Sequence, residues 1–127
     1  LGGFAKTICQ PLAAGEADPL VPLNRRFGTL LQALCALPQW FIVAVEGAAM
    51  GGGFGLVCCA DQVLAHTSAQ FATPEVTLGI VPAQIAPFVV RRIGQAAARR
   101  QCSARQCSRC TADRPGGAVP TRARRKA

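Results

Sequence analysis

The feature that most restricts how this chain can fold is a cluster of glycines inside an apolar run, VEGAAMGGGFGLVCCAD, residues 45–61. Five glycines stand there, at positions 47, 51, 52, 53 and 55. Glycine inside a strand or helix costs about 0.5–1 kcal/mol relative to alanine, so the cluster needs a physical reason. Three explanations compete: a closely packed membrane helix, a loop that cradles phosphate, and a backbone that holds a reacting oxygen.

The first two explanations fit poorly. Residues 40–60 carry one charge, and Gly47-x-x-x-Gly51 matches the small-residue pattern of paired membrane helices. However, Glu46 would stand near the centre of the span, where a charge costs roughly 3 kcal/mol. The phosphate-binding patterns G-x-x-x-x-G-K-[ST] and G-x-G-x-x-G are both absent. An oxygen-holding turn and plain close packing of a strand on a helix remain, and the glycines alone favour close packing.

The segments before the cluster predict a loop, a helix and a strand. Three prolines in residues 11–23 predict a loop. Apolar residues spaced by three and four from Phe27 to Leu37 predict an amphipathic helix capped by Asn24 and ended by Pro38. The apolar run at residues 40–45 predicts a strand that is covered on both faces.

The segments after the cluster continue the alternation. Residues 54–61 predict a short buried helix, and residues 62–67 predict a second strand. The prolines of residues 69–87 predict mostly loop, with a short extended piece around Phe71. Residues 88–100 predict a further helix that tolerates Gly94. Helices alternating with buried strands predict an α/β fold with helix-covered strands.

The charges divide the chain into two parts. Residues 1–90 hold three cations and five acids, whereas residues 91–127 hold eleven cations and one acid. We therefore predict a domain at residues 1–100 and a basic tail at residues 101–127, which is disordered because Val119 is its only aliphatic residue larger than alanine. Such an abrupt change is typical of a frameshift in a GC-rich gene. A basic arm for nucleic acid or anionic membrane is an alternative that we do not favour.

The cysteines and the single histidine indicate no metal site. Cys102, Cys107 and Cys110 have the spacing of three iron–sulfur ligands, but no fourth cysteine follows. The cysteines of the domain stand in apolar settings and predict reduced thiols in the cytoplasm. His66, the only histidine, is expected at the surface. The start of the chain has no targeting signal and reads like the middle of a protein.

From about Leu30 to Arg100 the chain resembles the crotonase family, the enoyl-CoA hydratases and isomerases. The matching blocks are FIVAVEGAAMGGGFGLVCCADQVLA, AQFATPEVTLGIVP and a helix ending RRIG. The resemblance implies a partial ββα-repeat core, an acyl-CoA thioester substrate and no separate cofactor. It also implies a homotrimer or hexamer for the full-length protein, with no nucleic acid and no membrane as partner.

The resemblance also implies roles for single residues. The backbone N–H of Gly52, flanked by Gly51 and Gly53, would hold the thioester oxygen and stabilise an enolate. Glu75 would be the catalytic acid and base, presented from a bend by Pro74. The second oxyanion donor of the family would precede Leu1 and is missing from the chain. An acyl pocket is expected at Met50, Phe54, Gly55, Pro74, Val81 and Pro82, and no metal is expected.

One departure from the family pattern leaves the reaction open. Family hydratases usually carry a second glutamate at the position of Gly55. A single glutamate suits double-bond isomerisation, and it also serves hydration if another group positions the water. Gly55 and the segment PAQIAP, residues 82–87, resemble the branch that hydrates branched glutaconyl-CoA esters in terpene and leucine breakdown, the isohexenylglutaconyl-CoA hydratases. We therefore expect a hydratase, with an isomerase or a non-enzymatic remnant as alternatives, and low activity for the chain as written.

The remaining polar residues of the matching blocks are expected to be structural. Glu46 stands where the family commonly has a polar residue. Asp61 follows CCA, as an aspartate does in the family, and is expected to satisfy backbone groups.

Overall fold

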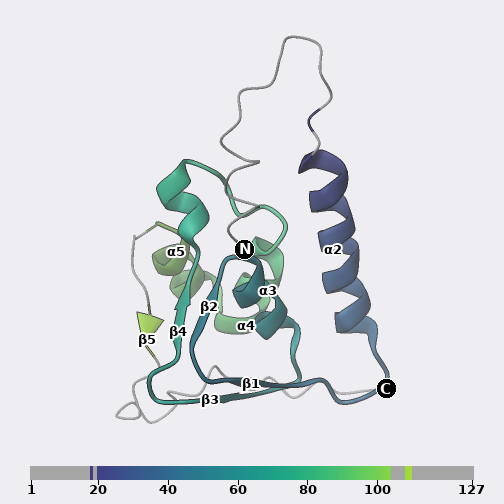
Figure 1. Ribbon diagram of the computed structural model, residues 1–127, viewed down its shortest axis with the longest axis vertical. Helices are drawn as coiled ribbons and strands as arrows, with labels where there is room; N and C mark the ends of the chain where they lie inside the picture. Colours follow the sequence, from purple (N-terminus) through teal and green to yellow (C-terminus); the bar gives the residue numbers. More distant parts are fainter. Residues whose placement is uncertain (1–17, 19, 104–107, 110–127) are drawn as a thin grey trace.

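The computed structural model describes residues 18, 20–103 and 108–109. Its elements follow one another in two similar runs of strand, strand and helix, preceded by a long helix (Figure 1). In chain order they are α2 (Leu20–Ala36), β1 (Ile42–Val45), β2 (Ala48–Met50), α3 (Gly52–Cys59), β3 (Gln62–Ala65), β4 (Gln70–Ala72), the 3-10 helix η1 (Pro74–Leu78), α4 (Ala86–Ile93), α5 (Gln95–Ser103) and β5 (Ser108–Arg109).

The strands form two small sheets, and the first four strands alternate between them along the chain. β1 pairs in parallel with β3, from Ile42 opposite Gln62 onward, and β2 pairs in parallel with β4, from Ala48 opposite Gln70 onward. Parallel neighbours need a crossover, which α3 provides between β2 and β3. The two sheets meet at a corner, and α3 lies inside it (Figure 1). The predicted α/β fold with ββα units and helix-covered strands is confirmed.

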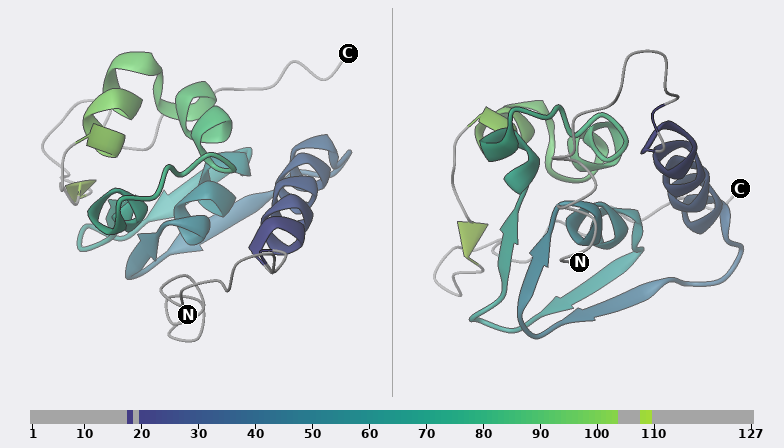
Figure 2. Two further views of the ribbon diagram at one scale, coloured as in Figure 1. Left: turned by 90° about the horizontal axis from the view of Figure 1, so that it is seen from above. Right: turned by 45° about the horizontal axis from the view of Figure 1, so that its top comes forward.

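The hydrophobic core is formed by residues of α3, its neighbouring helices and the strands, and Figure 2 shows how these elements are arranged around α3. Leu31 of α2 and Val89 of α4 are fully buried there. The rings of Phe54 on α3 and Phe71 on β4 pack with their centroids 5.7 Å apart, a separation typical of favourable aromatic pairs. The core therefore ties both helices and both sheets to α3, whose first residues are the glycine cluster.

The helix before the cluster begins earlier than the sequence predicts. α2 starts at Leu20, so Asn24 lies inside the helix, and the predictions that Asn24 caps it and that residues 20–23 are loop are wrong. Asp18 lies at this end instead, and its Oδ1 accepts a hydrogen bond of 2.8 Å from the Leu20 N–H. Proline is tolerated in the first turn, where its missing N–H would have no acceptor. This is why Pro22 does not delay the helix.

Two further local predictions are wrong. The strand at Ile42–Val45 is covered on one face only: among the described residues, Ile42 and Leu64 stay 53% and 56% exposed on the other face. The helix predicted over residues 88–100 is two helices, α4 and α5, because Gly94 between them has φ +82°. The Gly94 N–H closes the end of α4 by donating to the Val90 carbonyl at 2.9 Å.

Helical structure continues past the predicted boundary at residue 100. Gln101 is buried, its side-chain amide donates to the Phe71 carbonyl at 2.7 Å, and its own carbonyl accepts from the Thr73 hydroxyl at 2.9 Å. These bonds tie α5 to the end of β4, and Ser108–Arg109 pairs with β4 as well. Residues 101–103 and 108–109 are thus ordered where the sequence predicts disorder. The rest of the predicted tail lies outside the described residues.

Within the described part of the chain, no helix is long and apolar enough to cross a membrane. Cys58 and Cys59 are buried and Cys35 is half-buried, while Cys9 and the tail cysteines 107 and 110 lie outside the described residues. His66 is exposed, as predicted, and its Nδ1 lies 2.7 Å from the hydroxyl of Ser68.

Candidate active site

The glycine cluster forms a tight turn between strand β2 and helix α3. Gly51 occupies the N-cap of α3 with φ +53°, a conformation in which glycine avoids the steric cost of a side chain. Its N–H donates to the Ala72 carbonyl at 2.8 Å, and its carbonyl accepts from the Gly55 N–H at 3.0 Å. The N–H groups of Gly52 and Gly53 come next, in the first turn, where a helix offers them no internal acceptor.

The paired strands bring Glu75 to the same turn. Met50 at the end of β2 stands opposite Ala72 at the end of β4, and the chain leaves β4 through Thr73 into η1, which begins at Pro74. The buried Thr73 hydroxyl is anchored on α5, and the Glu75 carbonyl accepts from the Ile80 N–H at 3.0 Å. These bonds hold η1 against the end of the sheet.

The carboxylate of Glu75 lies directly over Gly51. A β-carbon placed on Gly51 would collide with Glu75 Oε1 and stand 3.2 Å from Cδ. The other oxygen, Oε2, is buried and has no hydrogen-bond partner among the described residues. Buried carboxylate oxygens are normally hydrogen-bonded. Oε2 is therefore available to accept a hydrogen bond from a water, or to take a proton from a substrate carbon. The sequence placed the acid and base at Glu75, and the structure brings this side chain to the glycine turn.

The other side of the turn is apolar. The ring of Phe27 on α2 packs against Gly52, where an added β-carbon would stand 3.1 Å from the ring. Gly55 faces Ile85: an added β-carbon would collide with Ile85 Cγ2 and stand 3.7 Å from Leu31 Cδ1. Ile85 is 3% exposed. The position where family hydratases usually carry a second glutamate therefore has no space for a side chain.

The site combines a strand that ends in a glycine turn, a helix N-terminus and a carboxylate over that turn. The crotonase resemblance implies this combination, and the comparison with family models agrees. Residues 13–116 match the model described as enoyl-CoA hydratase/isomerase. The chain belongs to this family of enzymes. It spans only part of its relatives, 34% of the length of the enoyl-CoA hydratase AKT6-1 of Alternaria alternata, to which it is 32% identical over 78% of its own length.

Solved structures of the family have the same fold. An enoyl-CoA hydratase/isomerase from Marinobacter aquaeolei is 44% identical with a TM-score of 0.72, and the match covers 85% of this chain and 41% of that one. Pseudomonas aeruginosa AtuE is 50% identical with a TM-score of 0.72, over 76% of this chain and 38% of that one. This crotonase-family chain is thus similar to both over its described core.

The six residues of the predicted acyl pocket range from buried to exposed. Phe54 is 3% exposed and packs in the core against Phe71, whereas Val81 is 76% exposed. Pro74 is exposed, and Met50 and Pro82 are half-buried. The acyl-pocket assignment stays a prediction.

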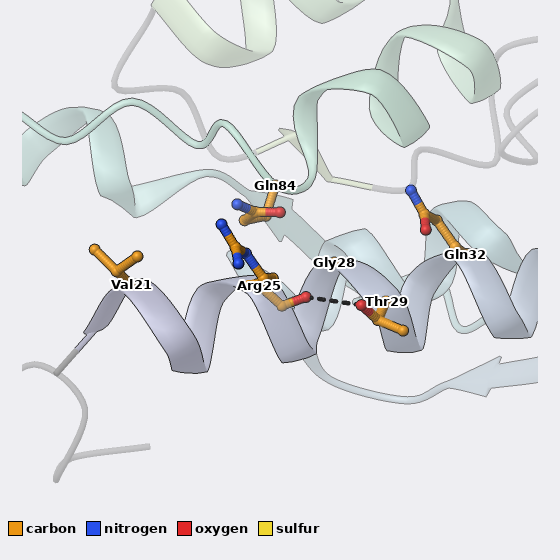
Figure 3. Close-up of a pocket in the computed structure, with 6 residues that line it drawn as sticks. All are labelled: Val21, Arg25, Gly28, Thr29, Gln32 and Gln84. Atoms are coloured by element: carbon orange, nitrogen blue, oxygen red, sulfur yellow. Dashed lines mark hydrogen bonds between the residues drawn. The ribbon is translucent and has the colours of Figure 1, made fainter.

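A polar groove lies between α2 and the loop before α4, and the sequence pattern did not indicate it (Figure 3). It has a volume of about 390 Å³ and runs along one side of α2. The guanidinium of Arg25 points toward the side-chain amide of Gln84, which comes from the loop before α4. The lining residues are Val21, Arg25, Gly28, Thr29, Gln32 and Gln84. A pattern search would pass over Arg25 and Gln84 because each is an ordinary polar residue in its own segment.

The far end of α3 is held by a buried cation. Arg92 of α4 is 7% exposed, and its Nη1 donates to the Ala60 carbonyl at 2.7 Å, next to the end of the helix. Burial lowers the pKa of the Arg92 guanidinium, while the charges of Cys58 and Asp61 oppose this shift. A cation here interacts favourably with the helix dipole. Arg92 thereby fixes α3 to α4 and, through α3, the orientation of the glycine turn.

The other polar residues of the family pattern have structural contacts or face solvent. The Asp61 carboxylate accepts from the Phe41 N–H at 2.9 Å, and the Asp61 N–H donates to the Phe41 carbonyl at 2.8 Å, so the prediction that it satisfies backbone groups is confirmed. Glu46 is exposed. Within the part of the chain that the structure describes, no group of three His, Cys, Asp or Glu side chains is arranged to hold a metal ion.

Proposed function

We propose that this chain carries the central part of an enoyl-CoA hydratase that adds water to a branched glutaconyl-type acyl-CoA, as isohexenylglutaconyl-CoA hydratase does. The observation that carries the proposal is the position of Glu75, whose carboxylate lies over the turn that ends in the Gly52 N–H. The proposed proton acceptor, on η1, and the proposed oxyanion donor, in the glycine turn, therefore belong to neighbouring segments. A proposal for substrate class rests further on Gly55 and on the loop before α4.

In the proposed reaction the thioester oxygen accepts a hydrogen bond from the Gly52 N–H. Glu75 takes a proton from water as the water oxygen bonds to the β-carbon, and the electron pair of the double bond moves to give an enolate. The Gly52 N–H stabilises the negative charge that develops on the thioester oxygen. Glu75 then returns the proton to the α-carbon. The products balance as one water added across one double bond, and coenzyme A enters as part of the substrate.

Isomerisation is the second candidate, and one observation favours it. Ile85 fills the space over Gly55, so the described residues offer no second carboxylate to hold a water there. A single base can instead take a proton from the γ-carbon of such an α,β-unsaturated ester and return it to the α-carbon, through a dienolate held by the same Gly52 N–H. Hydration remains the preferred proposal because the buried Glu75 Oε2 has no hydrogen-bond partner within the described part of the chain and can accept a hydrogen bond from a water by itself.

Product analysis separates the two reactions. The protein is incubated at high concentration with 3-methylglutaconyl-CoA in D₂O, and the products are resolved by mass spectrometry. Hydration adds one oxygen and a carbon-bound deuterium at the α-carbon, whereas isomerisation exchanges carbon-bound hydrogen for deuterium without adding oxygen. A hydrated product supports the first proposal, deuterium exchange alone supports the second, and neither product at any enzyme concentration would overturn both.

The assembly and the compartment are proposed on the same footing. Family members are oligomeric, and we propose a homotrimer or hexamer for the full-length protein. The exposed apolar side chains of β1, β3 and α2, among them Ile42, Leu64 and Leu30, support an assembly or further chain that covers them. We also propose the cytoplasm, a reducing compartment, because the described cysteines stand in apolar settings, with Cys58 and Cys59 buried.

A further inference from the structure

The groove on α2 is built by the periodicity of the helix. Val21, Arg25, Gly28 and Gln32 recur at spacings of four, three and four, and so they lie on one stripe of α2. The core-facing residues Phe27, Leu31 and Leu34 form the adjacent stripe. The groove therefore runs along the border between the buried and the exposed side of α2, next to the residues that touch the glycine turn.

Two residues next to the groove, Ile85 and Phe27, contact the first turn of α3. A β-carbon on Gly28 would collide with Gln84 Oε1, so the absence of a side chain at Gly28 is what lets the Gln84 amide approach the helix. The next residue, Ile85, packs over Gly55. On α2, the residue before Gly28 is Phe27, which packs against Gly52. Phe27 and Ile85, the chain neighbours of two residues that line the groove, thus connect it with the first turn of α3.

The chemistry of the groove fits an anion. Arg25 is exposed, and its guanidinium forms no ion pair with any acid among the described residues. The Thr29 hydroxyl donates to the Arg25 carbonyl at 3.1 Å and leaves the guanidinium free to point toward Gln84 (Figure 3). A guanidinium offers paired donors that match the two oxygens of a carboxylate, and the Gln84 amide adds a neutral donor beside it.

We propose that Arg25 and Gln84 bind a carboxylate on the acyl group of the substrate, which makes them specificity-determining residues for carboxylated enoyl-CoA esters. This inference rests on the proposed function. The phosphates of coenzyme A are the other anions that an acyl-CoA carries. The long pantetheine arm separates them from the thioester. The groove residues Gly28 and Gln84 are instead the chain neighbours of Phe27 and Ile85, which contact the first turn of α3, and a carboxylate a few carbons from the thioester fits this position better.

The test compares two esters that differ only in this group. The dissociation constants of 3-methylglutaconyl-CoA and 3-methylcrotonyl-CoA, which carries a methyl group in place of the carboxymethyl group, are measured by titration calorimetry with the full 127-residue chain. The variants are Arg25→Gln and Gln84→Glu, and the control is Arg26→Gln, which removes the same charge from the same helix outside the groove. Circular dichroism checks that each variant is folded.

The proposal predicts that Arg25→Gln weakens binding of 3-methylglutaconyl-CoA about tenfold, the low end for a charge-assisted hydrogen bond, and leaves 3-methylcrotonyl-CoA unchanged. Gln84→Glu should weaken the same ester by repulsion, and Arg26→Gln should change neither. Equal weakening of both esters by Arg25→Gln would overturn the proposal and place a phosphate of coenzyme A at Arg25. No change for either ester would also overturn it. A wild-type chain that binds neither ester would refute the proposed function itself.

Discussion

The carboxylate of Glu75 lies over the α-carbon of Gly51, so closely that a β-carbon at position 51 would collide with Oε1. The two residues come from different ββα units, and the parallel pairing of β2 with β4 brings them together. The backbone that forms the helix N-terminus and the carboxylate proposed to move the proton are thus positioned by the same two strands.

Glu75→Gln should lower turnover of an enoyl-CoA ester by about 100- to 10,000-fold, the usual contribution of a general acid and base. Glutamine keeps the size of the side chain but cannot take the proton. The check is the initial rate at saturating ester, with Glu46→Gln as the control because Glu46 is exposed. If Glu75→Gln keeps more than a tenth of the rate, Glu75 does not carry the proton transfer.

Alanine substitutions at Gly51 and Gly53 should change the free energy of unfolding in opposite directions. Gly51→Ala should lower the free energy of unfolding by roughly 1–3 kcal/mol, because φ at position 51 is +53° and the methyl group would displace Glu75. Gly53→Ala should raise it by about 0.5–1 kcal/mol, because Gly53 is helical and has open space around its α-carbon. Urea denaturation measures both. A stabilising Gly51→Ala would contradict the geometry of the turn.

Sequence reasoning located the glycine turn and Glu75 but not their neighbours. The turn and the Pro74-Glu75 pair are visible because residue types and spacing encode them directly. The contacts of Gly55 with Ile85 and of Gly28 with Gln84 depend on how α2 and the loop before α4 pack on α3. No local pattern encodes that packing, and so the groove was not predicted.

The local errors have specific physical causes. The sequence favoured Asn24 as a helix cap because asparagine is a good cap, but Asp18 occurs earlier and Pro22 is tolerated in the first turn. The sequence predicts a single helix that tolerates Gly94, whereas the positive φ of Gly94 ends α4. The apolar run at residues 40–45 predicted a strand covered on both faces, but periodicity does not reveal whether a covering element is present among the described residues.

Gly55 and Ile85 should behave as one packing unit. Gly55→Ala alone should lower the free energy of unfolding by about 1–3 kcal/mol, because the new methyl group would collide with Ile85 Cγ2. Ile85→Ala alone should cost roughly 2–5 kcal/mol as a buried truncation. The double variant should cost at least about 1 kcal/mol less than the sum, since each change relieves the other. Additivity within about 0.5 kcal/mol would show that the two side chains do not compete for this space.

Arg92→Ala should lower the free energy of unfolding by about 2–4 kcal/mol, because it removes a buried side chain and leaves the Ala60 carbonyl without its 2.7 Å hydrogen bond. Arg91→Ala on the same helix is the control and should change stability by less than about 0.5 kcal/mol, since Arg91 is exposed. Chemical denaturation of both variants is the measurement. Two other guanidinium nitrogens, Nε and Nη2, are buried without a partner among the described residues. The cost of burying them opposes the stabilisation that the hydrogen bond to Ala60 provides. If Arg92→Ala is neutral or stabilising, the cost of burying this charge exceeds what its hydrogen bond to α3 contributes, and Arg92 does not hold the helix in place.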